Sequence, residues 1–242
     1  MQIYLTVVIP AYDEQHRIKP TLKEIIKYLS DKEFSSEIIV VDDGSSDKTN
    51  QISKEVLRKF PSHKVLKLSP NQGKGAAIKT GVSHAQGKYI LFMDADNSTH
   101  IQQIENLLPY IEEYPIVIGS RHISKESIKR KQSFIRRILS RTSNFLIRRM
   151  LRTRILDTQC GFKLFQGSVA KNIFDKVEIK RFGFDIEIIA ITLAQEIPIK
   201  EVPVNWYDAG RSKLRAGQAA FATLIELLKI RRNLRRGVYD KN

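Results

Sequence analysis

Short apolar runs alternate along this chain with helical patterns, and this alternation is the feature that most constrains its fold. Runs rich in β-branched residues predict strands, and apolar residues spaced three or four apart predict helices. Regular alternation predicts an α/β fold with a mostly parallel sheet flanked by helices. The predicted strands are Leu5–Ile9, Glu37–Val41, Lys64–Leu68, Tyr89–Met93 and Ile116–Ile118, and the predicted helices are Thr21–Leu29, Lys48–Phe60, Lys74–Ala85 and Ile101–Glu113.

The length and composition predict one domain over residues 1–242, because no stretch rich in Pro, Gly or Ser separates two halves. The single cysteine, Cys160, has no partner for an internal disulfide, which is typical of a cytosolic protein. The opening residues predict a buried strand rather than a signal peptide, and no run of about 18 uncharged apolar residues is present. We therefore expect a cytoplasmic protein that contacts a membrane only peripherally.

Basic residues concentrate in the second half of the chain. Residues 1–120 hold 14 Lys and Arg against 15 Asp and Glu, whereas residues 121–242 hold 27 against 11. Residues 121–154 alone hold 12 basic residues and one acidic residue, Glu126. This distribution predicts that an anionic partner meets the second half.

Two segments of the second half, residues 135–151 and 216–234, combine apolar residues at helical spacing with many arginines. Both predict basic amphipathic helices. Their apolar faces suit either shallow insertion into a membrane surface or packing on the core, and the sequence leaves both open. Arginines near an anionic leaflet favour the membrane face.

Polar motifs follow four of the predicted strands. They lie at residues 10–14 (PAYDE), 42–47 (DDGSSD), 94–96 (DAD) and 119–121 (GSR). Ligands of parallel sheets bind beyond the carboxyl ends of the strands, so we expect these motifs to form one active-site rim.

Asp94 and Asp96 are separated by one residue at the end of an uncharged strand. Paired carboxylates suit a hard divalent cation that is shared with a diphosphate, and such a cation neutralises the charge on a departing nucleoside diphosphate. A polar loop that caps the next helix is the alternative. Asp42 and Asp43 suit hydrogen bonds to a base or ribose, although turn and capping chemistry explains Ser45 to Asp47. Asp185 and Glu187 suit either acceptor-side carboxylates or capping residues.

Taken in order, these blocks resemble the family-2 nucleotide-sugar glycosyltransferases, which have the Rossmann-like GT-A fold. The resemblance continues through DTQCGFKLF at 157–165 and RFGFDIEI at 181–188 to GRSKL at 210–214. The later blocks look most like dolichyl-phosphate or polyprenyl-phosphate glucosyltransferases and mannosyltransferases. Ser98 departs from the pattern, because many relatives have a glutamine there that bears on a third metal ligand.

The resemblance implies an inverting transfer of a hexose from a nucleotide sugar to a polyprenyl or dolichyl phosphate, with UDP-glucose as the first expected donor and GDP-mannose as the second. It implies Mg²⁺ or Mn²⁺ as cofactor, with catalytic roles for Asp94, Asp96 and Arg121. Residues 1–120 would bind the donor, and residues 121–242 would bind the acceptor and face the membrane. Implied donor-binding residues are Pro10, Tyr12, Glu14, Val41, Asp42, Asp43, Asp94, Ala95, Asp96, Arg121 and Lys213, implied metal ligands are Asp94 and Asp96, and implied acceptor-binding residues are Arg121, Arg136 and Arg137.

Other functions fit the sequence less well. A nucleotidyltransferase would need a glycine-rich opening loop followed by arginine, which is missing. A nucleic-acid-binding module predicts aromatic residues among the basic ones, but residues 121–154 contain only Phe134 and Phe145, so we expect no nucleic-acid partner. A protein or soluble-sugar acceptor would leave the charge distribution unexplained.

Overall fold

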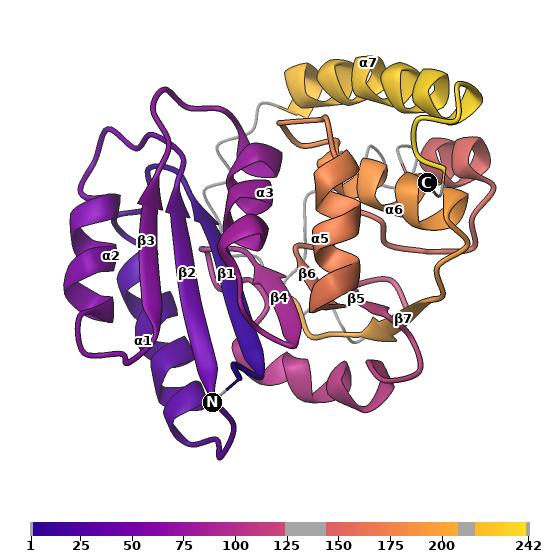
Figure 1. Cartoon of the computed structure of the whole chain (residues 1–242). Coiled ribbons are helices and arrows are strands. Elements are labelled where there is room, and N and C mark those ends of the chain that lie inside the picture. Colours follow the sequence, from indigo (N-terminus) through magenta and orange to yellow (C-terminus); the bar gives the residue numbers. More distant parts are fainter. Residues whose placement is uncertain (1, 124–143, 208–215, 241–242) are drawn as a thin grey trace.

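The protein is described here by a computed structural model that covers residues 2–123, 144–207 and 216–240, without the side chains of 216–224. One seven-stranded sheet with the order β3-β2-β1-β4-β6-β5-β7 spans both halves of the chain (Figure 1). β6 runs antiparallel to β4 and β5, and the other neighbouring strands pair in parallel, so the predicted fold class is confirmed. The strands are β1 (Leu5–Ala11), β2 (Ser36–Asp42), β3 (His63–Lys67), β4 (Tyr89–Met93), β5 (Ile116–Ser120), β6 (Phe162–Gln166) and β7 (Ile199–Pro203).

Helices cover both faces of this sheet, and each face has its own apolar core. Successive side chains of a strand point to opposite faces, so Val8 packs in one core while Val7 and Ile9 pack in the other. The first core includes α3, α5, α6 and α7, and the second includes α1 and the 3₁₀ helix η1 (Ile101–Asn106). The helices are α1 (Ile18–Ser30), α2 (Thr49–Leu57), α3 (Lys74–His84), α5 (Gly167–Lys176), α6 (Phe184–Ala194) and α7 (Ala216–Arg235).

The predicted helix Ile101–Glu113 is wrong in type and extent. The chain forms two short 3₁₀ helices there, η1 (Ile101–Asn106) and η2 (Leu108–Tyr110). Pro109 explains the break, because it lacks the N–H that a continuous α-helix needs and its ring collides with the preceding turn. β1, in contrast, extends through Pro10 beyond its predicted end. The residue pairs between β1 and β4 end at Val8 and Phe92, so the missing N–H of Pro10 removes no hydrogen bond to β4.

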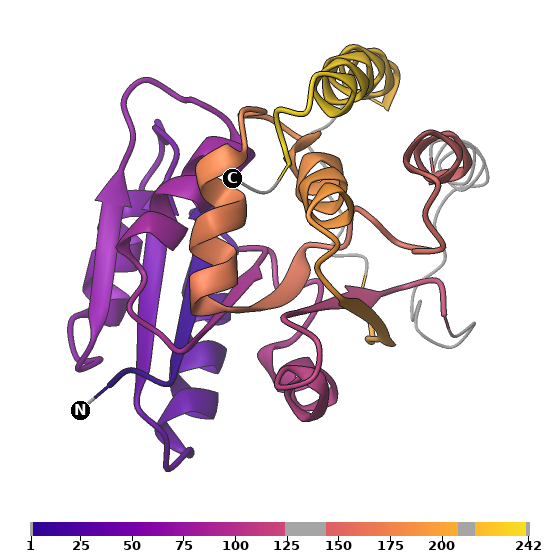
Figure 2. The same ribbon diagram turned by 45° about the vertical axis from the view of Figure 1, so that its right-hand side comes forward.

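The two basic C-terminal segments are described only in part. Residues 144–151 are helical and the rest of the predicted helix 135–151 lies outside the described residues, while α7 begins and ends close to the prediction. Both helices lie at the same end of the molecule in Figures 1 and 2. Among the described residues, no helix combines the length and apolarity that crossing a membrane requires.

Candidate active site

Three of the predicted motifs meet at the carboxyl edge of the sheet. Ala11 at the end of β1 pairs with Asp42 at the end of β2, and the Asp43 amide donates to the Ala11 carbonyl at 2.8 Å. From α1, the Thr21 hydroxyl donates to the carbonyl of Ala95 at 2.9 Å. Short hydrogen bonds therefore fix the 10–14 segment to the 42–47 segment, and α1, which follows residues 10–14, to the 94–96 segment.

The segment after β1 presents one ring and one carboxylate at this edge. Tyr12 is 44% exposed, which leaves part of its ring accessible. The Glu14 carboxylate binds the Arg17 guanidinium through two contacts, and the Glu14 amide donates to the Thr49 hydroxyl at 2.7 Å. Pro10 is buried within β1. The loop is thus held by α1 and by the start of α2.

Asp42 and Asp43 have different surroundings although they are adjacent. Asp42 is fully buried, and its Oδ1 accepts the Ser45 amide at 2.9 Å while its Oδ2 has no hydrogen-bond partner. Val41 precedes it inside the core. An unsatisfied buried carboxylate oxygen is costly, and a bound N–H donor would relieve that cost.

Asp43 organises the loop that precedes α3. Its carboxylate accepts the backbone amides of Gln72 at 2.8 Å and Gly73 at 2.7 Å, and the side-chain amide of Asn71 at 2.9 Å. Gly73 has φ +107°, a conformation that suits glycine, and it leads directly into Lys74. Asp43 therefore helps to aim the first turn of α3 at the site.

The carboxylates of Asp94 and Asp96 follow β4 and each lies near a cation. Lys74 Nζ lies 2.7 Å from Asp94 Oδ1, and Arg17 Nη1 lies 3.8 Å from Asp96 Oδ2. The Ser98 amide donates to Asp96 Oδ1 at 3.0 Å, so Ser98 serves the loop through its backbone. Burial lowers the pKa of Lys74, but Asp94 and Asp185 outweigh it and the pKa is raised overall.

This pair suits a divalent cation that is shared with a substrate. Carboxylate oxygens are the ligands that Mg²⁺ and Mn²⁺ favour, and the two side chains remain 35% and 28% exposed. Among the described residues no group of three or more His, Cys, Asp or Glu is placed to hold a metal. A diphosphate and water suit the remaining positions around such a cation. Gly161 leaves room for the Asp94 carboxylate, because a Cβ at position 161 would lie 2.1 Å from Asp94 Oδ2.

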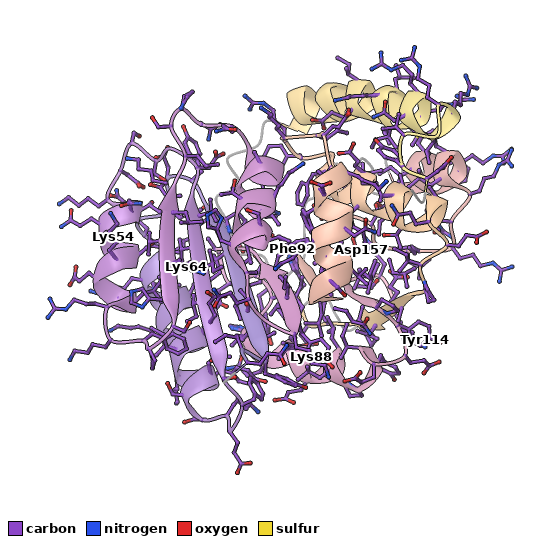
Figure 3. The ribbon with its side chains drawn as sticks, in the orientation of Figure 1. Lys54, Lys64, Lys88, Phe92, Tyr114 and Asp157 are labelled. Carbon is purple, nitrogen blue, oxygen red and sulfur yellow. The ribbon has the colours of Figure 1, made fainter. Side chains whose placement is uncertain are left out.

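Arg121 follows β5 and is locked by Asp157. Its Nε and Nη2 donate to the two carboxylate oxygens at 2.7 and 2.8 Å, and its backbone amide donates at 3.0 Å. Burial raises the pKa of Asp157, but Arg121 outweighs it and holds the pKa at about 2. The guanidinium also lies 5.7 Å from the Trp206 ring centre. Asp157, labelled in Figure 3, thus fixes the orientation of Arg121.

Four residues of this arrangement were not among the predicted site residues: Arg17, Lys74, Asp157 and Lys163. A lysine in the first turn of a helix opposes the helix dipole, so Lys74 carried a signal that sequence reasoning passed over. Lys163 is fully buried in β6, where it donates to Asp185 and to the Cys160 carbonyl. Asp185 is thus an ion-pair partner rather than a helix cap.

Three predicted site residues, Arg136, Arg137 and Lys213, lie outside the described residues. Their assignment to the acceptor and donor stays a prediction. The described site therefore consists of the β1, β2 and β4 edge, Lys74 and Arg121.

Comparison with known proteins identifies the family and the fold of this chain. Residues 6–174 match the model of glycosyl transferase family 2. The chain is 39% identical to a dolichyl-phosphate beta-glucosyltransferase of Dictyostelium discoideum over 95% of this chain and 74% of the relative, and 33% identical to that of Saccharomyces cerevisiae over 100% and 78%. The crystal structure of glucosyl-3-phosphoglycerate synthase from Mycobacterium tuberculosis in complex with Mn²⁺, uridine diphosphate and glucosyl-3-phosphoglycerate shares the fold. Its TM-score is 0.70 at 18% identity, and the match covers 94% of this chain and 80% of that chain. The chain belongs to glycosyl transferase family 2 and is a hexosyltransferase with the GT-A fold.

Proposed function

We propose that this enzyme transfers glucose from UDP-glucose to dolichyl or another polyprenyl phosphate, with inversion at the anomeric carbon. The observation that carries this proposal is the acidic pair Asp94 and Asp96 at the end of β4, faced by Lys74 in a chain 39% identical to a named dolichyl-phosphate glucosyltransferase. An acidic pair beside a cation is the arrangement that a diphosphate and its metal ion require.

The donor nucleotide lies against the ends of β1 and β2 in this proposal. Tyr12 offers a ring for stacking on the base, and Glu14 and Asp43 border the ribose. The free Oδ2 of Asp42 accepts an N–H of the base, with Pro10 and Val41 shaping the wall. Lys213 closes over the donor from the C-terminal side.

Asp94 and Asp96 hold Mg²⁺ or Mn²⁺, with Ala95 between them against the donor. The cation stabilises the charge that develops on the departing nucleoside diphosphate. Lys74 places a second positive charge on the same side of the site. Asp157 holds Arg121 in one orientation for a phosphate group.

The acceptor phosphate binds Arg121, with Arg136 or Arg137 supplying further charge. A phosphate monoester is already ionised near neutral pH, since its second pKa lies near about 6, and it attacks without a general base. What the enzyme supplies is positive charge that brings two anions together, and guanidinium groups bind phosphate oxygens in pairs. An acceptor without a phosphate is the alternative.

The enzyme works peripherally on the cytoplasmic face of a membrane in this proposal. α7 turns Leu227 and Ile230 into the core, while Ile225 and Leu228 are 55% and 60% exposed beside arginines. On the helix at residues 144–151, Phe145 is 65% exposed. Large apolar side chains among arginines are typical of surfaces that meet anionic lipid.

The function is tested by incubating the protein with Mn²⁺, dolichyl phosphate and radiolabelled UDP-glucose, GDP-mannose or UDP-GlcNAc, and measuring label that enters organic solvent. We expect transfer from UDP-glucose, loss of transfer in chelator, and loss in Asp96→Ala. The exposed Lys54→Ala on α2 is the matched control with full activity. Transfer that survives both chelator and Asp96→Ala contradicts the mechanism.

The membrane face has its own test. Ile225→Ser with Leu228→Ser should abolish sedimentation with phosphatidylserine vesicles and leave sedimentation with neutral phosphatidylcholine vesicles at its low level. Tyr110→Ser, a third exposed apolar residue on η2, should bind as the wild type does. If the wild-type protein does not sediment with phosphatidylserine vesicles, the proposed membrane face is wrong.

A further inference from the structure

Four charged side chains of alternating sign, Asp94, Lys74, Asp185 and Lys163, lead from the end of β4 into the core. Asp94 contacts Lys74 at 2.7 Å, the charges of Lys74 and Asp185 act on each other, and Asp185 Oδ1 accepts a hydrogen bond from Lys163 Nζ. Lys163 and Asp185 are 0% and 4% exposed. An ion pair buried this deeply is costly to maintain, so its position directly behind the site calls for a function.

Packing holds Lys74 beside Asp185. A Cβ on Gly75 would lie 2.7 Å from the Cβ of Phe184, so the first turns of α3 and α6 touch through this glycine. The Ala76 amide donates to the Lys180 carbonyl at 3.1 Å, and Lys74 Nζ lies 5.7 Å from the Phe184 ring centre. The Lys74 ammonium therefore contacts Asp94 directly and also feels the charge of Asp185 in the core.

We propose that Asp185 is a positioning residue that sets how tightly the site holds its divalent cation, because it competes with Asp94 for the Lys74 ammonium. A cation that binds Asp94 must share that carboxylate with Lys74 or displace it. Asp185 offers Lys74 a second counter-ion, and the hydrogen bond from Lys163 Nζ fixes the orientation of the Asp185 carboxylate. This inference rests on the proposed function, which places the cation at Asp94 and Asp96.

Two substitutions should change metal affinity in opposite directions. Asp185→Asn removes the second counter-ion, so Lys74 stays on Asp94. We expect Mn²⁺ to bind about tenfold more weakly, because the variant loses one negative charge in the neighbourhood of a divalent cation. Lys74→Met removes the competing ammonium, so Mn²⁺ binds about tenfold more tightly. A merely structural role for Asp185 predicts no such opposition.

α6 supplies a matched control. Glu187 is also buried on this helix, but it accepts the Tyr239 hydroxyl at 2.6 Å and the Ile179 amide at 2.7 Å. Glu187→Gln removes a buried charge of the same sign outside the network of Asp94, Lys74, Asp185 and Lys163. It should leave Mn²⁺ affinity within about twofold of the wild type.

The experiment titrates Mn²⁺ alone into each purified full-length variant and follows the free Mn²⁺ signal by electron paramagnetic resonance, after a melting curve shows that the variant is folded. If Asp185→Asn is too unstable, Asp185→Asn with Lys163→Met removes both partners of the ion pair and should still bind Mn²⁺ more weakly than the wild type. Equal affinities in wild type, Asp185→Asn and Lys74→Met overturn the inference and leave the proposed transfer intact. Wild type that transfers glucose without binding Mn²⁺ overturns both.

Discussion

The ion pair between Arg121 and Asp157 gives the sharpest stability prediction, and Asp157→Asn is the change that tests it. Asp157 is fully buried and accepts three hydrogen bonds from Arg121 between 2.7 and 3.0 Å. Asparagine keeps the size of the side chain but removes the charge. It leaves the Arg121 guanidinium, which is 20% exposed, without its counter-ion.

The magnitude follows from the pKa of Asp157, which folding lowers from 3.8 to about 2. That difference corresponds to about 2 kcal/mol of stability at pH 7. In a chain of this length, a loss of about 2 kcal/mol lowers the unfolding midpoint by about 4–8 °C. Because the folded pKa is depressed, this stabilisation is present above about pH 4 and is lost as the pH falls toward 2.

Urea unfolding at pH 7 and pH 3 measures this directly. The gap in unfolding free energy between wild type and Asp157→Asn should shrink at pH 3, and glucose transfer should fall because Arg121 loses its orientation. Lys88→Gln is the control. Lys88, labelled in Figure 3, forms an exposed ion pair with Glu112 near the start of β4, so its loss should leave the urea unfolding midpoint unchanged. Equal stability of wild type and Asp157→Asn at pH 7 would refute the reasoning.

Three further predictions test buried contacts in the site and in the core. Gly161→Ala forces a methyl group against Asp94 and should abolish transfer while circular dichroism stays native; activity near wild type would contradict the close contact. Tyr239→Phe removes the hydrogen bond from the Tyr239 hydroxyl to the buried Glu187 Oε1, so the free energy of unfolding in urea should fall by about 1–3 kcal/mol with kcat unchanged. Equal stability would show that the bond is dispensable. Burial raises the pKa of Cys160 to about 12, so a thiol reagent at pH 8 should label it only after unfolding, and rapid native labelling would be inconsistent with this environment.

Local patterns predicted much of the fold. The strand predicted at Tyr89–Met93 agrees with β4 at both ends, because an uncharged run bounded by turns has few other places in a soluble α/β core. β6 and β7 were not predicted. Lys163 interrupts the apolar pattern of β6, and β7 carries two charged residues in five, so neither reads as a buried strand. The antiparallel insertion of β6 depends on pairing partners that are far away in the sequence.

The site divides in the same way. Motif positions placed Asp94, Asp96 and Arg121 at strand ends because parallel strands share one carboxyl edge. Their partners were not predictable, since Arg121 meets Asp157 across 36 residues and Lys163 meets Asp185 across 22. Such ion pairs leave no periodic signal in the sequence, and only the folded sheet brings them together. The assignments of Arg136, Arg137 and Lys213 stay predictions.

Asp43, Asp157 and Asp185 are each held by neighbouring groups, and this bears on the kind of acceptor that the enzyme can use. A transferase that activates an alcohol needs a carboxylate free to take a proton. Asp185 enters the network from α6, yet Lys163 holds it and it is nearly inaccessible; Asp43 and Asp157 are likewise held, by amides and by Arg121. These groups are suited to aim cations and loops.

An acceptor that arrives ionised removes the need for a base, and this gives a pH prediction. At saturating Mn²⁺, kcat/KM for dolichyl phosphate should fall below about pH 6, where the phosphate gains its second proton. Because the proton belongs to the acceptor, and because saturating Mn²⁺ offsets the weaker metal binding of Asp185→Asn, this variant should show the same limb as the wild type. A limb that shifts or disappears in Asp185→Asn would instead identify the enzyme's own carboxylate as the titrating group, and the base-free mechanism would be wrong.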